Sequence, residues 1–583
     1  MSEQKTHKCD HHCVIGNIFS KEYDQSFLEA FHEKQKQPTP SGKVVVYTAK
    51  NIITLDDLMP EAKAIAVQGN RIHSIGSLNS IETSLKAKGT KYEVNTQFQN
   101  NYFYPGFIES HCHASLEAVY HHFVYVGAYD RLNASGEIMP ALTTNNDVVE
   151  RLKESMGDKD ILIAWGYDPS VLKKGETCLT AQGLNKVSDN KSVIVMNMSG
   201  HIAYANHFAL NEMGYTNDCE TVGVVKENGQ LTGELQEFEA MGPILAKFEL
   251  SQAKLSDGLI AFASVAQKKG ITTATDLGLG LVPGAWKAMV NITNKASFPV
   301  KLSNYVFSHV YEQLGGSEAY FKAKELENSK LVISGVKIVS DGSIQGYTAN
   351  MKWPYYYDKD EAGIKNISVE DGISLFEDLV KHDIQAAIHT NGNAAIEDMI
   401  ACVSHVLRFA PDRDPRFRLE HCQTVSNEQL KQMKKYNILA NFFINHLYYW
   451  GDFHKAHTLG PDKVKSMNPL ASAKKLGVTF ALHSDAPITA VDPLRMIQNA
   501  IERKSFTGVV LGQDEQITVR QALEAVTKDA AYLLKEEKDK GTLEVGKYAD
   551  ITILEDDIEH LPSEEIANTN ILGTIVDGTL FVN

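Results

Sequence analysis

The chain has 583 residues, too many for one ordinary core, so we expect two or three structural parts built around a large α/β domain. Its formal net charge of -16 and isoelectric point near 5.7 disfavour nucleic acid and anionic membranes as partners. A small-molecule substrate is the expected partner, and assembly into a homo-oligomer is left open.

Seven cysteines are scattered along the chain, in an odd number and without the spacing of a disulfide framework. No segment has the length and apolarity of a membrane span, and the amino terminus lacks the apolar core of a signal peptide. These features predict a cytoplasmic protein.

Residues 1–42 form a predicted N-terminal extension that ends in the turn-rich sequence Gln-Pro-Thr-Pro-Ser-Gly. Five side chains in it have metal-ligand chemistry at close spacing, namely His7, Cys9, His11, His12 and Cys13. They could form a small extra metal site, but a closed zinc site would need four ligands from this one segment. An ordinary polar terminus is the default interpretation.

Short β-like runs broken by turns follow in residues 43–103, beginning with Val44-Val45-Val46-Tyr47. Similar runs return in residues 541–583, for example Asp550-Ile551-Thr552-Ile553-Leu554. We therefore predict one composite β-sandwich domain made from both ends of the chain.

Residues 104–540 contain eight strand-like runs that alternate with helix-like runs. Such alternation implies parallel pairing, and eight units predict a distorted TIM (β/α)8 barrel. The predicted strands end at residue 111 or span residues 272–276, 300–305, 332–338, 385–389, 417–421, 438–442 and 478–485. The first connection, about 115–260, is too long for a βα loop and predicts an inserted subdomain with its own strands.

The first barrel strand follows Pro105-Gly106 and is predicted to end at a histidine pair, His111 and His113. Side chains on a strand alternate with a period of two, so these two imidazoles would point the same way. Such a pair can bind one metal ion, although two unrelated histidines beside a strand end are the alternative.

Further chemistry-bearing residues stand at the carboxyl ends of later strands, where barrels carry their active sites: Lys337, His389, His421 and Asp485. Taken singly, either histidine would be an ordinary core residue and Asp485 a helix cap. Together with the histidine pair they predict a metal site.

Lys337 requires its own explanation, because an ammonium group beside cations would be repelled and costly to desolvate. We favour a carbamate, formed with carbon dioxide, that bridges two metal ions. The alternative is a plain lysine paired with the carboxylate of Asp341.

Several motifs together resemble the amidohydrolase superfamily, and the inserted segments Ser199-Gly200-His201 and Thr232-Gly233-Glu234 resemble its amidohydrolase-3 branch, which contains N-substituted formamide deformylase. The motifs are Pro105-Gly106-Phe107-Ile108-Glu109-Ser110-His111-Cys112-His113, Val336-Lys337-Ile338, Arg418-Leu419-Glu420-His421-Cys422-Gln423, Ser484-Asp485-Ala486-Pro487 and Leu543-Glu544-Val545-Gly546-Lys547-Tyr548-Ala549-Asp550. The resemblance runs from about residue 43 to residue 583.

The resemblance implies a barrel beside a composite β-domain, two zinc ions and metal ligands at His111, His113, Lys337, His389, His421 and Asp485. The chain departs from the family pattern at Glu109, where an aspartate is usual, and in the loops after His389 and Asn441. Those loops would face the substrate, so the resemblance leaves the substrate open.

We therefore predict a hydrolase that cleaves a carbon–nitrogen bond of amide or formamide type. A metal-activated hydroxide would attack the carbonyl while Asp485 carries the proton to the departing nitrogen. The candidate substrate-binding residue in the insertion is His201, for which a structural role is the alternative. Weaker candidates after the seventh strand are His446, Trp450 and Asp452, and for Trp450 packing is the alternative.

Two other functions are weighed. A deaminase of aminated heterocycles with one metal ion would need an acid soon after His389, and none comes before Glu397. A non-catalytic binding protein on a hydrolase barrel should have lost ligands, and none is missing. A content of one metal ion per chain would favour the deaminase over the predicted hydrolase. Metal removal would abolish turnover in a hydrolase, whereas in a binding protein it would only lower stability.

Overall fold

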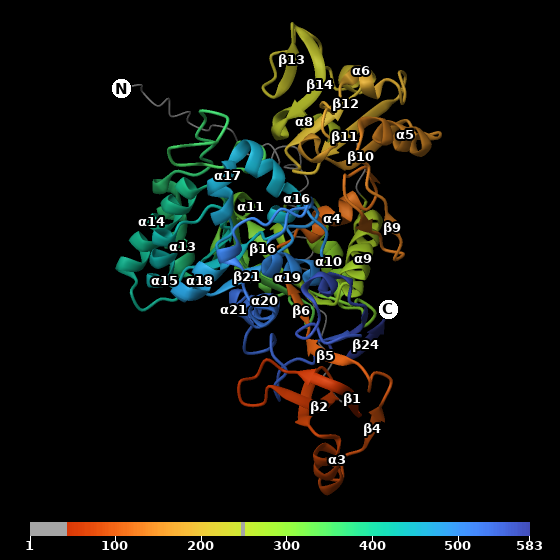
Figure 1. Ribbon diagram of the computed structural model, residues 1–583, viewed down its shortest axis with the longest axis vertical. Helices are drawn as coiled ribbons and strands as arrows, with labels where there is room; N and C mark the ends of the chain where they lie inside the picture. Colours follow the sequence, from red (N-terminus) through yellow and green to blue (C-terminus); the bar gives the residue numbers. More distant parts are fainter. Residues whose placement is uncertain (1–42, 246–250) are drawn as a thin grey trace.

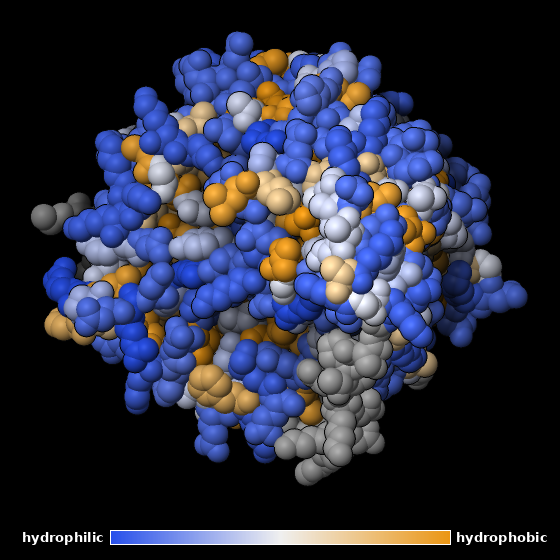
Figure 2. All heavy atoms as spheres, turned by 90° about the horizontal axis from the view of Figure 1, so that it is seen from below, coloured by the Kyte–Doolittle hydropathy of each residue, from blue (hydrophilic) through white to orange (hydrophobic). Residues whose placement is uncertain are grey.

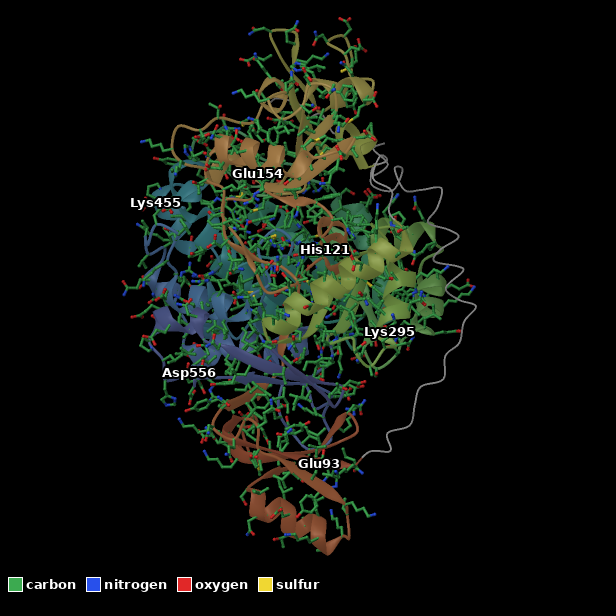
Figure 3. The ribbon with its side chains drawn as sticks, turned by 90° about the vertical axis from the view of Figure 1, so that its right-hand side faces the viewer. Glu93, His121, Glu154, Lys295, Lys455 and Asp556 are labelled. Atoms are coloured by element: carbon green, nitrogen blue, oxygen red, sulfur yellow. The ribbon has the colours of Figure 1, made fainter. Side chains whose placement is uncertain are left out.

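The computed structural model describes residues 43–245 and 251–583. Three parts lie in a row, with a barrel in the middle, the insertion at one end and a mixed sheet at the other (Figure 1). In the side view, Glu154 marks the insertion and Glu93 marks the opposite end (Figure 3). The five histidines and cysteines of the extension lie outside the described residues.

The middle part is an eight-stranded parallel sheet whose strands follow one another in chain order, which confirms the predicted barrel. Its strands are β6 (Phe107–Glu109), β15 (Ile271–Leu279), β16 (Lys301–Phe307), β17 (Leu331–Val339), β18 (Gln385–Thr390), β19 (Arg418–His421), β20 (Leu439–Phe442) and β21 (Phe480–Leu482). Backbone hydrogen bonds join the segments just after the first and last strands: the N–H of His113 donates to Ala486 at 2.7 Å and that of Asp485 to His111 at 3.0 Å.

Helices cover the outside of this barrel, so several of its strands are buried on both faces, as in parallel sheets generally. The helices are α9 (Gln252–Lys268), α10 (Ala285–Thr293), α11 (Ser308–Gln313), α12 (Ser317–Lys324), α13 (Val369–Lys381), α14 (Asn393–Phe409), α15 (Asn427–Lys435), α16 (Asn445–Phe453), α17 (Gly460–Lys463), α18 (Leu470–Leu476), α19 (Pro493–Glu502), α20 (Val519–Ala525) and α21 (Lys528–Leu533). Capping boxes begin α15 and α20, where Ser426 and Thr518 accept the backbone N–H three residues later.

Strand β6 is shorter than expected, because its ladder with β15 ends at Glu109. His111 and His113 therefore follow the strand instead of lying on it. Gly106 stands just before the strand, and a Cβ on it would come within 2.1 Å of Thr272 Oγ1. A glycine is required there because β6 and the start of β15 approach so closely.

The insertion lies between α4 (Ala114–Tyr120) and α9, which pack against each other. Their backbones touch at Gly258, whose Cβ would lie 2.0 Å from the carbonyl oxygen of Ala118. The insertion contains a six-stranded sheet in the order β13-β14-β12-β11-β10-β7. Its elements are β7 (Val124–Tyr125), β8 (Arg131–Leu132), β9 (Ile138–Met139), α5 (Asn145–Met156), β10 (Ile161–Tyr167), η2 (Pro169–Val171), α6 (Ala181–Leu184), β11 (Ser192–Asn197), β12 (Ile202–Ala205), α7 (His207–Glu212), β13 (Val224–Glu227), β14 (Gln230–Gln236) and α8 (Glu237–Leu245).

The third part is a mixed eight-stranded sheet that draws strands from both ends of the described chain. One face buries Val44, Val46 and Ala64 under helix α3 (Leu78–Ala87), and the other buries Ile52 and Ile551. The elements are β1 (Val44–Ile53), β2 (Glu61–Gln68), β3 (Arg71–Gly76), α3 (Leu78–Ala87), β4 (Tyr92–Asn95), β5 (Tyr102–Pro105), β22 (Ile551–Leu554), β23 (Ile571–Val576) and β24 (Thr579–Val582).

The end of the molecule that carries this sheet is mainly hydrophilic, with hydrophobic side chains scattered across it (Figure 2). In the described part of the chain, no helix is both long enough and apolar enough to cross a membrane. The five cysteines there are free thiols.

Candidate metal centre

His111 stands at the centre of a buried polar cluster at the carboxyl end of the barrel. Its Nδ1–H donates to Glu420 Oε2 at 2.6 Å, which leaves the lone pair on Nε2. Glu420 is held by Arg418 Nε at 2.6 Å and by Asn441 Nδ2 at 2.8 Å. Burial would raise the pKa of Glu420, but Arg418 and His111 hold that pKa well below its usual range. The ionised carboxylate therefore orients the imidazole for a ligand on Nε2.

Asp485 faces both histidines of the predicted pair. Its Oδ1 lies 3.2 Å from His111 Nε2 and 3.4 Å from His113 Nε2, but neither contact is aligned as a hydrogen bond. Burial would raise the pKa of Asp485, yet the neighbouring imidazoles hold it well below its ordinary value. The carboxylate is thus ionised at neutral pH.

Glu109 joins the two segments that carry these groups. Its Oε1 accepts the backbone N–H groups of His111 at 3.3 Å and Ser484 at 3.2 Å. Burial raises the pKa of this carboxyl to about 8. Glu109 therefore fixes backbone positions at the closing seam of the barrel.

His421 and His389 come together from adjacent strands. His421 Nε2 lies 2.9 Å from His389 Nδ1, and His421 Nδ1 lies 3.9 Å from Asp485 Oδ2. Burial lowers the pKa of His389 to about 3 and that of His421 well below its ordinary value. Both rings are therefore neutral at pH 7, the form in which an imidazole can bind a metal ion. His421 and Asp485 have backbone φ angles of 69° and 56°, a left-handed conformation that is strained for such residues and common at functional sites.

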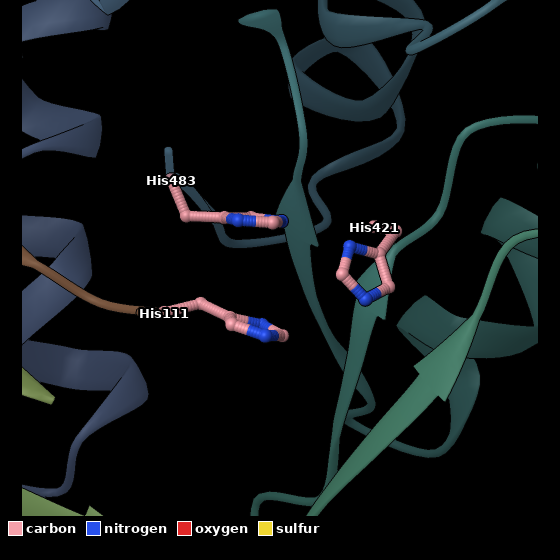
Figure 4. Close-up of side chains that lie close together, drawn as sticks. All are labelled: His111, His421 and His483. Carbon is pink, nitrogen blue, oxygen red and sulfur yellow. The ribbon is translucent and has the colours of Figure 1, made fainter. Parts of the chain in front are cut away.

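His483 belongs to the cluster although it is absent from the predicted ligand set. Its ring stacks on His111 with centroids 4.5 Å apart, and both rings face His421 (Figure 4). His111, His421 and His483 offer nitrogen atoms that all lie within 4.8 Å of one another, and so do the ligand atoms of His111, His113 and Asp485. His483 stands two residues before Asp485 in the predicted strand, and this spacing is the sequence signal for it, although it does not reveal that the ring has no hydrogen-bond partner.

Lys337 is also part of the cluster. Its Nζ lies 3.2 Å from His111 Nε2, and burial lowers its pKa to about 8. The alternative partner, Asp341, uses its carboxylate to accept the backbone N–H groups of Asn350, Asn391 and Gly392. The structure shows no ion pair between Lys337 and Asp341 in the described residues, and the state of Lys337 stays a prediction.

The buried donor atoms of the cluster fit a metal ion. Both ring nitrogens of His483, Nδ1 of His421 and Oδ1 of Asp485 are buried and have no hydrogen-bond partner. A buried polar atom without a partner costs about 1–3 kcal/mol, so four of them in one place call for a cation or an equivalent ligand. The structure thus brings together His111, His113, Lys337, His389, His421 and Asp485, and adds His483.

The predicted substrate-binding residues lie in two places. His446 and Trp450 are buried on α16, beside the cluster, with ring centroids 4.5 Å apart. His201 is half-buried on the turn between β11 and β12, where its backbone N–H donates to Ser199 Oγ. Asp452 is engaged by the hydroxyls of Ser505 and Thr507 at 2.9 Å each. The role of these residues in substrate binding stays a prediction.

Comparisons with known proteins find relatives along most of the chain. The chain is 24% identical to N-substituted formamide deformylase of Arthrobacter pascens, over 91% of this chain and 96% of that protein. It is 25% identical to protein LONG AFTER FAR-RED 3 of Arabidopsis thaliana, over 93% of each chain. A metal-dependent hydrolase of Pyrococcus horikoshii has the same fold, with a TM-score of 0.72 at 20% identity over 90% of this chain and all of that one.

A family model described as the amidohydrolase family matches residues 99–582. This match spans all eight barrel strands, the insertion and strands β5, β22, β23 and β24 of the composite sheet, together with every residue of the cluster. The chain therefore belongs to the amidohydrolase family.

Proposed function

We propose that this protein is a metal-dependent hydrolase that cleaves an amide or formamide-type carbon–nitrogen bond of a small molecule. The observation that carries the proposal is the group of buried, partnerless imidazole and carboxylate atoms at the carboxyl end of the barrel. A relative of similar length that is a formamide deformylase supports the choice of bond.

The proposed ligands are His111, His113, Lys337, His389, His421 and Asp485, with two zinc ions per chain and His483 beside them. Once bound, a divalent cation polarises a carbonyl group and makes water nucleophilic at neutral pH. The neutral amine of Lys337 can add to carbon dioxide with release of one proton, and the resulting carbamate is an anionic ligand. The pKa of about 8 keeps a useful share of this amine neutral near pH 7.

Asp485 has the properties required of the proton carrier. It is ionised because its pKa is held well below the ordinary value, so it can accept a proton. Its left-handed backbone and the hydrogen bond from its N–H to His111 fix it against the histidine pair. From this position it can deliver the same proton to the departing nitrogen.

The test combines metal counting with a substrate panel. The protein is stripped of metal with a chelator, reloaded with zinc and assayed on formamides, N-acyl amines, cyclic amides and esters. Two bound ions and release of an amine support the proposal. One ion, activity that survives Lys337→Ala, and ammonia release from an aminated heterocycle would favour a deaminase instead. Metal binding without turnover of any compound would favour a non-catalytic scaffold.

A further inference from the structure

Three buried side chains form a hydrogen-bonded row behind the candidate metal centre. Thr458 Oγ1 lies 2.7 Å from His454 Nδ1, and His454 Nε2 lies 2.9 Å from His446 Nδ1. His446 is 2% exposed, and His454 and Thr458 are fully buried. The two imidazole rings are nearly parallel, at 12°. Burial therefore keeps water away from the hydrogen bonds that join these three side chains.

His454 and Thr458 lie in η3 (His454–Thr458), a π-helical turn that follows α16. The N–H of Leu459 donates to the carbonyl of His454 at 2.8 Å, which closes the wide turn. The N–H of Tyr357 donates to the carbonyl of Thr458 at 2.8 Å and anchors the turn from outside. Single π-helical turns are rare and often occur at functional sites.

The hydroxyl of Thr458 fixes the direction of the protons in the row. In the described part of the chain its Oγ1 has no hydrogen-bond partner other than His454. A buried hydroxyl that did not donate would leave its proton unsatisfied, so Thr458 donates to His454 Nδ1. His454 then carries its proton on Nε2 and donates to His446 Nδ1. His446 must in turn carry its own proton on Nε2.

Both imidazoles are neutral, so each has only one proton to place. Burial lowers the pKa of His454 to about 3 and that of His446 well below its ordinary value. A neutral imidazole with the proton on Nε2 is a hydrogen-bond donor at that atom and nowhere else.

The Nε2 atom of His446 lies near the candidate metal centre. The ring of Phe443 stands between His446 and His483, with its centroid 4.6 Å from that of His446 and 4.9 Å from that of His483. His446 Nε2 has no hydrogen-bond partner in the described chain and, unlike the nitrogens of His483, is not sealed from open space. One face of the ring stacks on Trp450, whose Nε1–H donates to Asp168 of the insertion at 3.0 Å.

We infer that Thr458 and His454 hold His446 as the neutral Nε2–H tautomer, and that this N–H donates to the carbonyl oxygen of the substrate. The inference rests on the proposed function and deepens it, because a neutral donor suits an amide oxygen that gains negative charge during attack. His446 is then a substrate-binding residue, and His454 and Thr458 are positioning residues.

The tautomer can be read directly from ¹⁵N NMR spectra of the zinc-loaded protein labelled on histidine. Signals of His446 and His454 are assigned by their loss in His446→Gln and His454→Gln. We expect both rings to show the Nε2–H pattern, and Thr458→Val to replace the single pattern of His446 with a mixture. Thr458→Ser keeps the hydroxyl and should keep the wild-type spectrum. An Nδ1–H pattern for His446, or no change in Thr458→Val, would overturn the inference.

Kinetics on the best substrate of the panel then tests the donation. His446→Gln should lower kcat/KM by about 100-fold and Thr458→Val by about 10-fold, mainly through kcat, with unchanged metal content. His457→Gln is the matched control, because His457 lies in the same turn but is half-exposed and paired with Asp358. An equal loss in His457→Gln would show a merely structural effect and overturn the assignment. The spectra need no substrate, so an inactive protein would count against the proposed function while the tautomer is still decided.

Discussion

The two ends of the barrel bury polar groups in opposite ways. At the amino end, Lys301 pairs with Asp550 at 2.8 Å, and Lys330 donates to the carbonyls of Lys295, Ala296 and Phe298. At the carboxyl end, nitrogen and oxygen atoms of His421, His483 and Asp485 are buried without partners. The paired groups at the amino end stabilise the fold, whereas the unpaired groups at the carboxyl end are available to bind a ligand. The difference predicts that substitutions at one end affect stability and those at the other affect chemistry.

The largest effect is expected for Asp485→Asn at the carboxyl end. The amide keeps the shape and a ligand oxygen, but it cannot take up a proton. Turnover should fall by about 10²–10⁴-fold, the usual contribution of a positioned acid–base group, while much of the metal stays bound. Metal analysis and steady-state kinetics on the same sample check this.

Asp462→Asn is the control, because that carboxylate is 92% exposed and contacts Lys465 on the surface. It should leave turnover within about two-fold, in line with surface substitutions generally. Turnover that survives in Asp485→Asn would remove Asp485 from the mechanism.

This contrast also explains what the sequence could and could not predict. The barrel was predictable because its strands are continuous apolar runs that end in polar residues at regular intervals. The exact ends of the strands were not predictable. Strand β6 ends at Glu109, and Asp485 is held by a backbone hydrogen bond to His111, so these positions depend on contacts between segments that are distant in the sequence. His483 was missed because a buried histidine usually forms a hydrogen bond within the core, and only coordinates reveal that this one has none.

The next effect, at the amino end, concerns stability. Asp550→Asn would leave the ammonium of Lys301 buried without its counter-ion, and burial already lowers the pKa of that lysine. We expect a loss of about 3–5 kcal/mol in the free energy of unfolding. Denaturation measures this loss. Metal analysis should show that the zinc content per folded molecule stays the same.

The double variant Lys301→Met with Asp550→Leu is the companion experiment. It removes both charges and replaces them with apolar groups, so it should recover much of the stability lost in Asp550→Asn. If Asp550→Asn instead abolished zinc binding in folded protein, the separation between the two ends would be wrong.

A smaller effect is expected for Glu420→Gln, the group that orients His111 in the cluster at the carboxyl end. The amide can still accept from His111, but it no longer supplies the charge that offsets Arg418 or fixes the imidazole. Zinc affinity should fall by about 10–100-fold, as for other groups that orient a metal ligand. Competition with a chelator measures this, and unchanged affinity would mean that Glu420 serves stability alone.

The smallest effect concerns Asp529 on α21, a carboxyl at the amino end that is paired only weakly, with Lys474 Nζ 3.8 Å away. Burial raises its pKa from the ordinary 3.8 to about 6. The folded protein therefore binds this proton more tightly than the unfolded chain does, and stability is lost as pH rises from about 4 to about 6. Asp529→Asn does not titrate, so it should match the wild type near pH 4 and exceed it by about 1 kcal/mol at pH 7. The side chain is 20% exposed, which keeps the gain below the value for full burial. Urea denaturation at the two pH values measures the difference. A variant less stable than the wild type at pH 7 would show that Lys474 pairs with Asp529 as firmly as Asp550 does with Lys301.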